Sequence, residues 1–401
     1  MLTRWFVAPP RLGALVSRPA PPGPWPEALS SILSPETFAA AEAEIVAWDG
    51  YRPTPLRSLD RLAGELDLGA ILYKDESGRF GLGSFKALGG AYAVLRYLGD
   101  VLGERLGRPV ALSDIRAGRF TQEAATITVA AATDGNHGRA VAWGAQAAGC
   151  KCRIFVHAGV SEGRKAAMAA FGAEVVQIAG DYDASIRICA EQAAANGWQV
   201  ISDTAYEGYD DIPRQVMAGY GLLAAEILDE TMDNPPTHVF VQAGVGGLAA
   251  ALCARMWQAL GPRRPVFVLV EPERAACLTE SARRGQRTAV EIVEETVMAG
   301  LSCGEVSSLA WEILAPGAAH FVTISDDDVA PAMRMMAKGD AGGGAIEAGE
   351  CAVSGLIAMI AAARDPEARQ ALGLGADSRV VLIGSEGATD PEIYRALLNQ
   401  A

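Results

Sequence analysis

The stretch T-I-T-V-A-A-A-T-D-G-N-H-G-R-A-V-A-W (residues 126–143) joins an apolar run to a glycine-containing turn and then to a run that continues to Gly149. The first run is short and uncharged and ends at the turn, which is typical of a buried strand. The second run, 138–149, indicates a helix rich in small residues. A strand, a turn and a helix in this order form one unit of an open α/β sheet, where ligands bind beyond the carboxyl ends of the strands.

The same alternation continues on both sides of this stretch. Expected strands lie at 70–76, 126–132, 152–157, 174–178, 198–202, 238–243, 266–271, 320–324 and 380–384. Expected helices include 84–98, 138–149, 161–172 and 182–197. Continuous apolar strands separated by helices predict a mainly parallel sheet that is covered on both faces. Before them, residues 1–50 are rich in Pro and then in Ala and Glu, which predicts an irregular arm followed by one helix.

Composition narrows the class of protein. The chain has 401 residues and 50% hydrophobic content, which is enough for two domains or one bilobed unit. A formal net charge of −14 argues against a nucleic-acid partner. No uncharged apolar run reaches the length of a membrane span, and the N-terminus lacks a clear signal-peptide core, so we expect a cytoplasmic protein without a membrane partner. The seven cysteines and four histidines lack metal-binding spacing, so no metal is expected.

Lys86 lies in G-S-F-K-A-L-G-G (83–90), at the start of an expected helix and among small residues. Such a lysine can approach an aldehyde, whereas a lysine taken alone is usually an ordinary surface residue. The turn T-D-G-N-H-G (133–138) follows about one strand–helix unit later and offers backbone N–H groups and the carboxamide of Asn136 at a strand end. Lysine imine chemistry with pyridoxal phosphate needs both an accessible lysine and a turn that can bind the cofactor.

A second glycine turn, Q-A-G-V-G-G-L (242–248), separates an expected strand from an expected helix. Its N–H groups and the helix dipole suit a phosphate, although such turns also simply close strand–helix units. A dinucleotide fingerprint needs G-x-G-x-x-G, and that spacing is missing here. The sequence therefore favours a single phosphate, most simply that of pyridoxal phosphate.

Taken together, these segments resemble the fold-type II pyridoxal-phosphate enzymes, the group of tryptophan synthase β and the serine and threonine dehydratases. The chain is most similar to the 2,3-diaminopropionate ammonia-lyases. The resemblance is carried by Y-R-P-T-P-L (51–56), K-D-E-S-G-R-F-G-L-G-S-F-K-A-L-G-G (74–90), T-D-G-N-H-G-R-A-V-A-W (133–143), D-T-A-Y-E-G-Y (203–209), Q-A-G-V-G-G (242–247), M-A-G-L-S-C-G-E (298–305) and S-E-G-A-T-D (385–390).

The resemblance implies an α/β fold of two open, twisted, mainly parallel sheets flanked by helices, with the cofactor in the cleft between domains. It implies a large pyridoxal-phosphate-binding domain that begins in 1–80, a small domain at 81–189, and the remainder of the large domain at 190–401. It also implies a homodimer that takes a small amino acid as substrate.

The resemblance assigns roles to matching residues. Lys86 would hold pyridoxal phosphate as an imine, Asn136 would bind the ring hydroxyl, and Ser385 would face the pyridine nitrogen. The other expected cofactor contacts are Phe85, Gly244, Val245, Gly246, Gly247 and Glu350. At Glu350 the chain reads E-C-A-V-S-G where the family usually reads E-S-G-A, so close ring packing against a glycine is not expected in the same place.

Two acids distinguish this chain from the common dehydratases, which have Ser or Ala where Asp134 stands. Asp134 could be a helix cap and Asp203 a strand-end turn residue, but the β-ammonium of 2,3-diaminopropionate needs negative charge nearby. We therefore expect Lys86, Asp134 and Asp203 to be catalytic in an elimination that yields pyruvate and two ammonia, on both D and L substrates if Asp134 faces Lys86 across the substrate. The alternatives are a serine/threonine dehydratase, a β-replacement synthase, and a pyridoxal-phosphate-binding protein without turnover.

Overall fold

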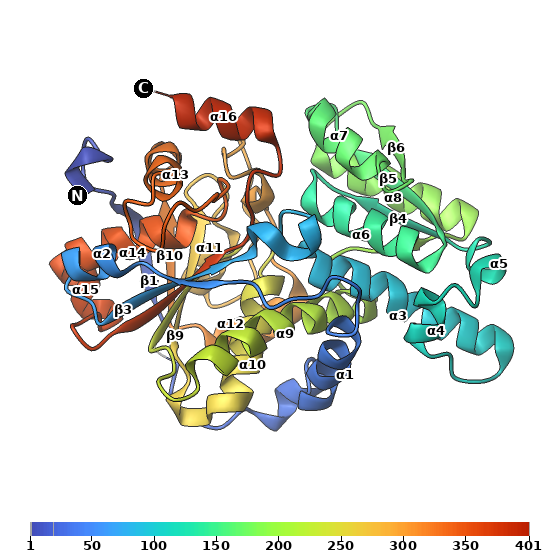
Figure 1. The fold of residues 1–401 in the computed structure, drawn as a ribbon, viewed down its shortest axis with the longest axis horizontal. Helices are drawn as coiled ribbons and strands as arrows, with labels where there is room; N and C mark the ends of the chain where they lie inside the picture. The colour runs from blue at the N-terminus through green and yellow to red at the C-terminus, as the bar shows by residue number, and fades with distance from the viewer. Residues whose placement is uncertain (1, 19, 401) are drawn as a thin grey trace. The chain divides into compact units, whose positions relative to one another are not determined.

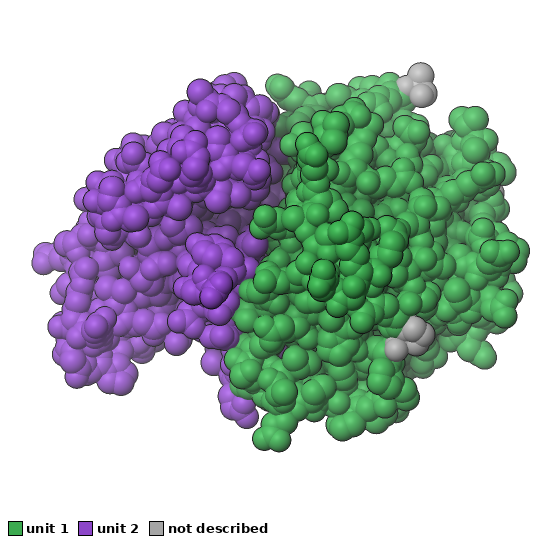
Figure 2. Space-filling view, turned by 180° about the vertical axis from the view of Figure 1, so that it is seen from behind, with its two compact units in different colours: residues 1–35, 53–84, 223–401 green, residues 36–52, 85–222 purple. Residues whose placement is uncertain are grey.

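The computed structural model describes residues 2–18 and 20–400. The chain forms two compact units, coloured separately in Figure 2. Unit 1 comprises 1–35, 53–84 and 223–401, and unit 2 comprises 36–52 and 85–222. These units do not follow the expected boundaries at 80/81 and 189/190, and that three-part division of the chain stays a prediction.

Unit 1 is built on a seven-stranded sheet with the order β1-β10-β9-β8-β11-β3-β2. Its strands are β1 (Leu12–Ser17), β2 (Leu56–Ser58), β3 (Ala70–Asp75), β8 (His238–Gln242), β9 (Val266–Pro272), β10 (His320–Ile324) and β11 (Arg379–Gly384). The five inner strands are parallel, and both edge strands are antiparallel to their neighbours. The mainly parallel sheet predicted from the sequence is confirmed, and so are its inner strands.

The edge strand β1 lies in the segment that the sequence analysis described as an irregular arm, and that prediction is wrong for Leu12–Ser17. The strand pairs antiparallel with β10, and the pairing continues as Arg18 N–H donates to Ala319 C=O at 2.7 Å. Prolines lie close to its apolar run on both sides, so the sequence pattern does not indicate a strand there. Pairing with a sheet edge satisfies backbone groups that the segment cannot satisfy alone.

Helices cover both faces of this sheet (Figure 1). The α-helices lying wholly in unit 1 are α2 (Asp60–Glu65), α10 (Gly247–Leu260), α11 (Cys277–Arg284), α12 (Ser308–Gly317), α13 (Val329–Ala337), α14 (Ser354–Arg364), α15 (Pro366–Leu372) and α16 (Pro391–Asn399). Short 3₁₀ helices are η1 (Leu2–Arg4), η2 (Glu27–Ser31), η3 (Glu76–Gly81), η4 (Gly261–Arg263), η5 (Ala299–Leu301) and η6 (Asp326–Asp328). Helix α14 is buried along almost its whole length, because it packs in the core against the central strands.

Unit 2 contains a four-stranded, fully parallel sheet with the order β6-β5-β4-β7. Its strands are β4 (Thr128–Ala132), β5 (Lys151–Val156), β6 (Glu174–Gln177) and β7 (Gln199–Val200). Its helices are α3 (Lys86–Leu106), α4 (Leu112–Arg116), α5 (Thr121–Ala124), α6 (Asn136–Ala148), α7 (Glu162–Ala169) and α8 (Tyr182–Asn196). Helix α1 (Pro35–Ile45) lies in unit 2 from Glu36 onward, and α9 (Asp211–Thr231) contains the boundary between Leu222 and Leu223.

The small residues after Lys86 serve helix packing. A Cβ added at Gly89 would lie 2.5 Å from the ring of Tyr220 on α9, and one added at Gly90 would lie 2.9 Å from Ala140 on α6. Real Cβ atoms do not approach so closely. The motif K-A-L-G-G thus allows α6 and α9 to lie directly against α3, and this packing fixes the helix that begins with Lys86.

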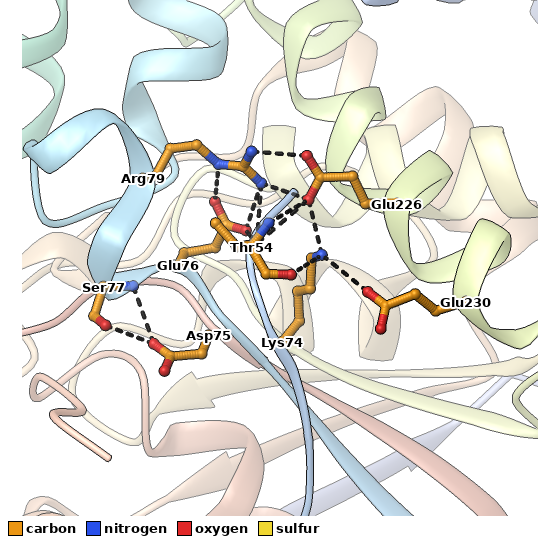
Figure 3. Close-up of polar contacts among 8 residues, drawn as sticks. All are labelled: Thr54, Lys74, Asp75, Glu76, Ser77, Arg79, Glu226 and Glu230. Atoms are coloured by element: carbon orange, nitrogen blue, oxygen red, sulfur yellow. Dashed lines mark hydrogen bonds and ion pairs between the residues drawn. The ribbon is translucent and has the colours of Figure 1, made fainter. Parts of the chain in front are cut away.

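A buried charge network ties together four segments of unit 1 (Figure 3). The guanidinium of Arg79 donates to Glu76 and to Glu226, and the Lys74 ammonium lies 2.8 Å from Glu226 Oε2. Thr54 joins the network through its hydroxyl, which donates to Glu76 Oε1 at 2.5 Å, and through its carbonyl, which accepts from Lys74 at 2.7 Å. The network balances two cations with two carboxylates, and it holds the 3₁₀ segment a few residues before Lys86.

Candidate active site

Two carboxylates and a histidine of unit 2 lie at the carboxyl edge of its sheet. His157 follows β5, Asp134 follows β4 and Asp203 follows β7. The order β5-β4-β7 places these strand ends next to one another, because parallel strands all end at the same edge. The edge therefore carries two carboxylates in a region where ligands of α/β proteins bind.

Lys86 is the first residue of α3, and its ammonium forms a close pair with Asp203. The distance from Lys86 Nζ to Asp203 Oδ2 is 2.5 Å, and the two side chains are only 22% and 19% exposed. Lys86 Nζ also lies 5.4 Å from the centre of the Phe85 ring and 6.0 Å from that of Tyr220. The amine is thus held by one carboxylate and lies near a pair of aromatic rings that pack against each other.

Asp203 is held in its ionised form. Burial raises its pKa, but the Lys86 ammonium, through its charge and its hydrogen bond, lowers it well below the ordinary carboxyl value. His137 lies with Nδ1 4.0 Å from Asp203 Oδ2, and its Nε2 lies 2.8 Å from Ile201 C=O. A carbonyl only accepts, so Nε2 carries the proton. Burial lowers the pKa of His137, which keeps the ring neutral with Nδ1 unprotonated.

Asp134 does not cap the helix that follows it. The N-cap of α6 is Gly135, which has no side chain that could cap the helix. The hydroxyl of Thr133 accepts the N–H groups of Gly135 and Gly138 at 3.1 and 3.2 Å instead. The helix-cap alternative for Asp134 is therefore wrong, because the neighbouring threonine already fills that role.

The Asp134 carboxylate instead faces His157. Asp134 Oδ1 lies 3.2 Å from His157 Nε2, and both side chains are about one-quarter exposed. The other ring nitrogen of His157, Nδ1, accepts the N–H of Gly159 at 3.1 Å. Because Nδ1 accepts, the proton of a neutral ring is on Nε2. Asp134 Oδ1 nevertheless has no hydrogen-bond partner among the described residues, so its contact with Nε2 is a close approach and not a hydrogen bond. Asn136, the first residue of α6, follows Asp134 by two residues and is half-buried.

In unit 1, the glycine turn follows β8 and begins α10. The N-cap is Gly246, whose φ of +97° is a left-handed conformation that favours glycine, and no side chain caps the helix. A Cβ on Gly244 would lie 2.9 Å from Cys303 Sγ, so this position also requires glycine. Val245 C=O accepts from Ser307 N–H at 3.0 Å, which orients the turn. The first N–H groups of α10, beginning at Gly247, remain available for an anion.

Ser385 follows β11, and its partner comes from the neighbouring parallel strand β8. Gln242 Nε2 donates to Ser385 Oγ at 2.5 Å and to Ile383 C=O at 2.9 Å. The side chains of Gln242 and Ser385 and the Ile383 carbonyl are all buried in unit 1. Sequence reasoning quoted Gln242 only as part of the glycine turn and missed this contact, because it joins residues 143 positions apart.

Glu350 lies buried in the turn before α14. The residue just before it is Gly349, where an added Cβ would lie 2.5 Å from Gly387 C=O. The N–H of Gly349 donates to Glu386 C=O, and Cys351 N–H donates to the carboxylate of Glu386. Gly349 therefore packs closely against the loop that carries Ser385, and the packing of this segment against the cofactor ring stays a prediction.

Cys277 and Cys303 both lie close to Gly244. Cys277 Sγ lies 3.7 Å from Gly244 C=O, and Cys303 Sγ would lie 2.9 Å from a Cβ added at the same glycine. Neither cysteine is in a disulfide, and burial raises the pKa of Cys277 well above its ordinary value. No group of three or more potential metal ligands occurs among residues 2–18 and 20–400. Within the same residues, no helix has both the length and the apolar character that a bilayer crossing requires.

Comparisons with known proteins agree with this arrangement. The model of the family described as pyridoxal-phosphate dependent enzyme matches residues 47–386, and this chain belongs to that family. It is similar to the diaminopropionate ammonia-lyase of Escherichia coli (strain K12), with 37% identity over 87% of this chain and 88% of that one. The expected resemblance to the ammonia-lyases, the fold type and the pyridoxal phosphate cofactor are confirmed.

Two solved structures of Escherichia coli diaminopropionate ammonia-lyase have a similar fold. The selenomethionine holo form has a TM-score of 0.86 and 33% identity, with 98% of each chain covered. A complex with an aminoacrylate–pyridoxal phosphate azomethine intermediate has a TM-score of 0.84, the same identity and the same coverage. The matched proteins are thus similar over almost the whole chain, including both units.

The residues of this structure fit pyridoxal phosphate. An uncapped helix preceded by obligatory glycines suits a phosphate, and Lys86 lies at a helix start with limited exposure. Ser385 accepts a hydrogen bond from Gln242 and keeps its own proton for a further acceptor. The individual roles expected of Lys86, Phe85, Asn136, Gly244, Val245, Gly246, Gly247, Glu350 and Ser385 nevertheless stay predictions.

Proposed function

We propose that this chain splits both D- and L-2,3-diaminopropionate into pyruvate and two molecules of ammonia. The substrate loses its α-proton and its β-amino group, and one water converts the resulting enamine to pyruvate and the second ammonia. The observation that carries the proposal is the Lys86–Asp203 pair, an amine and an ionised carboxylate 2.5 Å apart. A leaving group that is itself an amine needs such a carboxylate.

Bound pyridoxal phosphate supplies an electron sink for the pair of electrons left on the α-carbon. Lys86 holds the cofactor covalently through Nζ, and Asn136 binds the ring hydroxyl. The turn that contains Gly244, Val245, Gly246 and Gly247 binds the phosphate through backbone N–H groups. These assignments follow from the family and are supported by the uncapped start of α10.

Asp203 provides the counter-charge for whichever ammonium group is beside it. In the structure that group is Lys86, and Asp203 stays ionised because its pKa is held far below the ordinary carboxyl value. When Lys86 is covalently occupied, the β-ammonium of the substrate is the cation that Asp203 attracts. His137 adds an unprotonated Nδ1 on the same side, so the site accepts hydrogen bonds from an ammonium and does not repel it.

Asp134 is the base for one enantiomer, and Lys86 is the base for the other. An α-proton points to opposite faces in the two enantiomers, so a single base cannot remove both. Support for a reactive role comes from the local geometry, because Thr133 caps the helix in place of Asp134, and Asp134 Oδ1 is buried without a hydrogen-bond partner among the described residues, 3.2 Å from His157 Nε2. The Asp134 carboxylate therefore does not stabilise the start of α6.

The test is pyruvate release from D- and L-2,3-diaminopropionate, D- and L-serine and L-threonine by the wild type, Asp134→Asn and Asp203→Asn. We expect Asp134→Asn to lose roughly 10²–10⁴-fold on one diaminopropionate enantiomer and little on the other. We expect Asp203→Asn to weaken both, and to affect serine less, because serine has no β-ammonium. Equal small losses on every substrate, in step with the melting temperature, would show that both acids are structural.

Homodimer formation and a cytoplasmic location are part of the same proposal. Light scattering on the purified protein should give twice the chain mass of 41.9 kDa. A single-chain mass at working concentration would contradict the dimer.

A further inference from the structure

Gln242 is buried at the carboxyl end of β8, and its orientation can be assigned from its contacts. Ile383 C=O can only accept a hydrogen bond, and it lies 2.9 Å from the Gln242 atom assigned as Nε2. Exchanging the amide oxygen and nitrogen would place two oxygens against each other. The same Nε2 lies 2.5 Å from Ser385 Oγ. Both N–H groups of the amide are thus used, one on each partner.

The contact restricts what Ser385 can do. A serine hydroxyl has one proton to donate and two lone pairs that accept. Gln242 occupies one lone pair, and among the described residues no protein acceptor for the Ser385 proton is found. The amide oxygen of Gln242 is also buried without a hydrogen-bond partner in the part of the chain that the structure describes. Leaving such an oxygen unsatisfied destabilises the folded state, so any favourable contribution of the Gln242 amide comes from its two N–H donors.

We propose that Gln242 is a positioning residue that holds Ser385 as a hydrogen-bond donor toward the pyridine nitrogen of the cofactor. This inference rests on the proposed contact between Ser385 and that nitrogen. A fixed donor favours the unprotonated, neutral pyridine, because a protonated ring would bring a second proton to a hydroxyl whose own proton already points at it. Gln242 thereby acts on the cofactor through Ser385, without touching the cofactor itself.

The experiment uses the holoenzyme of Gln242→Leu, Gln242→Glu, Ser385→Ala and the double variant Gln242→Leu/Ser385→Ala. The matched control is Gln258→Leu in α10, since Gln258 Nε2 also donates to a backbone carbonyl, that of Leu33 at 2.8 Å, and its Oε1 also lacks a partner among the described residues. The readouts are the visible absorbance of the bound cofactor as a function of pH, cofactor retention on dialysis, kcat and KM.

We expect Gln242→Leu to shift the absorbance in the direction that Ser385→Ala does, and to lower kcat roughly tenfold, the equivalent of one hydrogen bond, with KM nearly unchanged. In the Ser385→Ala background the same change should have no further effect, because the partner is gone. Gln242→Glu should give the same spectral change, since its carboxylate draws the serine proton away from the ring, and it serves if the leucine variant does not fold. Gln258→Leu should leave the spectrum unchanged.

Three results would overturn the inference. One is a wild-type spectrum and kcat in both Gln242 variants. Another is an equal loss of kcat with and without Ser385. The third is a wild-type spectrum in Ser385→Ala, which also removes the proposed pyridine contact while leaving the ammonia-lyase function standing. Failure of the function itself is seen separately, as a wild-type enzyme that releases no pyruvate from 2,3-diaminopropionate.

Discussion

Replacing Glu226 by Gln should strongly destabilise unit 1. Glu226 accepts two hydrogen bonds from Arg79, at 2.7 and 2.8 Å, and lies 2.8 Å from the Lys74 ammonium (Figure 3). The substitution keeps the shape but leaves two buried cations with Glu76 as the only buried carboxylate of the network. Removing one partner of a buried ion pair costs about 3–5 kcal/mol, because the remaining charge is not compensated.

The matched control is Glu230→Gln, one helical turn further along α9. Glu230 is 46% exposed and lies 3.9 Å from the same ammonium. A half-exposed pair of this kind contributes roughly 0–1 kcal/mol. The two variants make the same chemical change to one helix, so the difference between them isolates burial.

The assay is urea unfolding followed by the fluorescence of the seven tryptophans. With a slope of about 3 kcal/mol per M, the Glu226 variant should unfold at a midpoint lower by roughly 1 M or more, and the Glu230 variant close to the wild type. Burial raises the pKa of Glu226, but Arg79 and Lys74 lower it below the ordinary value overall. Its contribution to stability is therefore present above the ordinary carboxyl pKa and is lost as pH falls below it. Equal midpoints for the two variants, or an unchanged acid sensitivity in Glu226→Gln, would refute this account.

Three further predictions concern the site. Lys86→Ala should leave no cofactor attached to the protein after borohydride treatment, as judged by mass spectrometry of the intact chain; retention of the adduct would reassign the lysine. Gly244→Ala should weaken cofactor retention on dialysis, because its Cβ would lie 2.9 Å from Cys303 Sγ, and Cys303→Ala should partly restore it; no rescue would place the cause elsewhere. His157→Leu should selectively weaken the enantiomer that depends on Asp134, because it removes the polar ring nitrogen 3.2 Å from the Asp134 carboxylate, whereas His157→Gln keeps a polar group there and should have the smaller effect; equal behaviour of the two variants would count against that contact.

Local features of the fold and site could be predicted from the sequence. The inner strands are short apolar runs, and the turns with Lys86 and with Gly244 are contiguous motifs whose residue types specify their conformation. The position of Asp134 after a strand was also predictable, but its helix-cap alternative was settled only by the side chain of Thr133. Local rules rank both residues as good caps, and only the backbone geometry decides between them.

Contacts between distant segments could not be predicted. Strand β1 lies between prolines in a segment whose composition indicates an irregular arm, and it becomes a strand because β10 offers an edge with which it can pair. The contact between Gln242 and Ser385 depends on β8 and β11 being neighbours in the sheet, although other strands separate them in the chain. The order of strands in the sheet decides which strand ends meet, and that order cannot be read from a single sequence.

The same physical arrangement occurs in both units. In each, a side chain expected to act on cofactor or substrate stands at the carboxyl end of a parallel strand, and a polar side chain from the neighbouring strand lies against it. In unit 2, His157 after β5 has Nε2 3.2 Å from Oδ1 of Asp134, which follows β4. In unit 1, Gln242 at the end of β8 donates a hydrogen bond to Ser385, which follows β11. The Gln242 contact takes one lone pair of the serine before any ligand binds, so the hydrogen bonds that remain to Ser385 are set during folding.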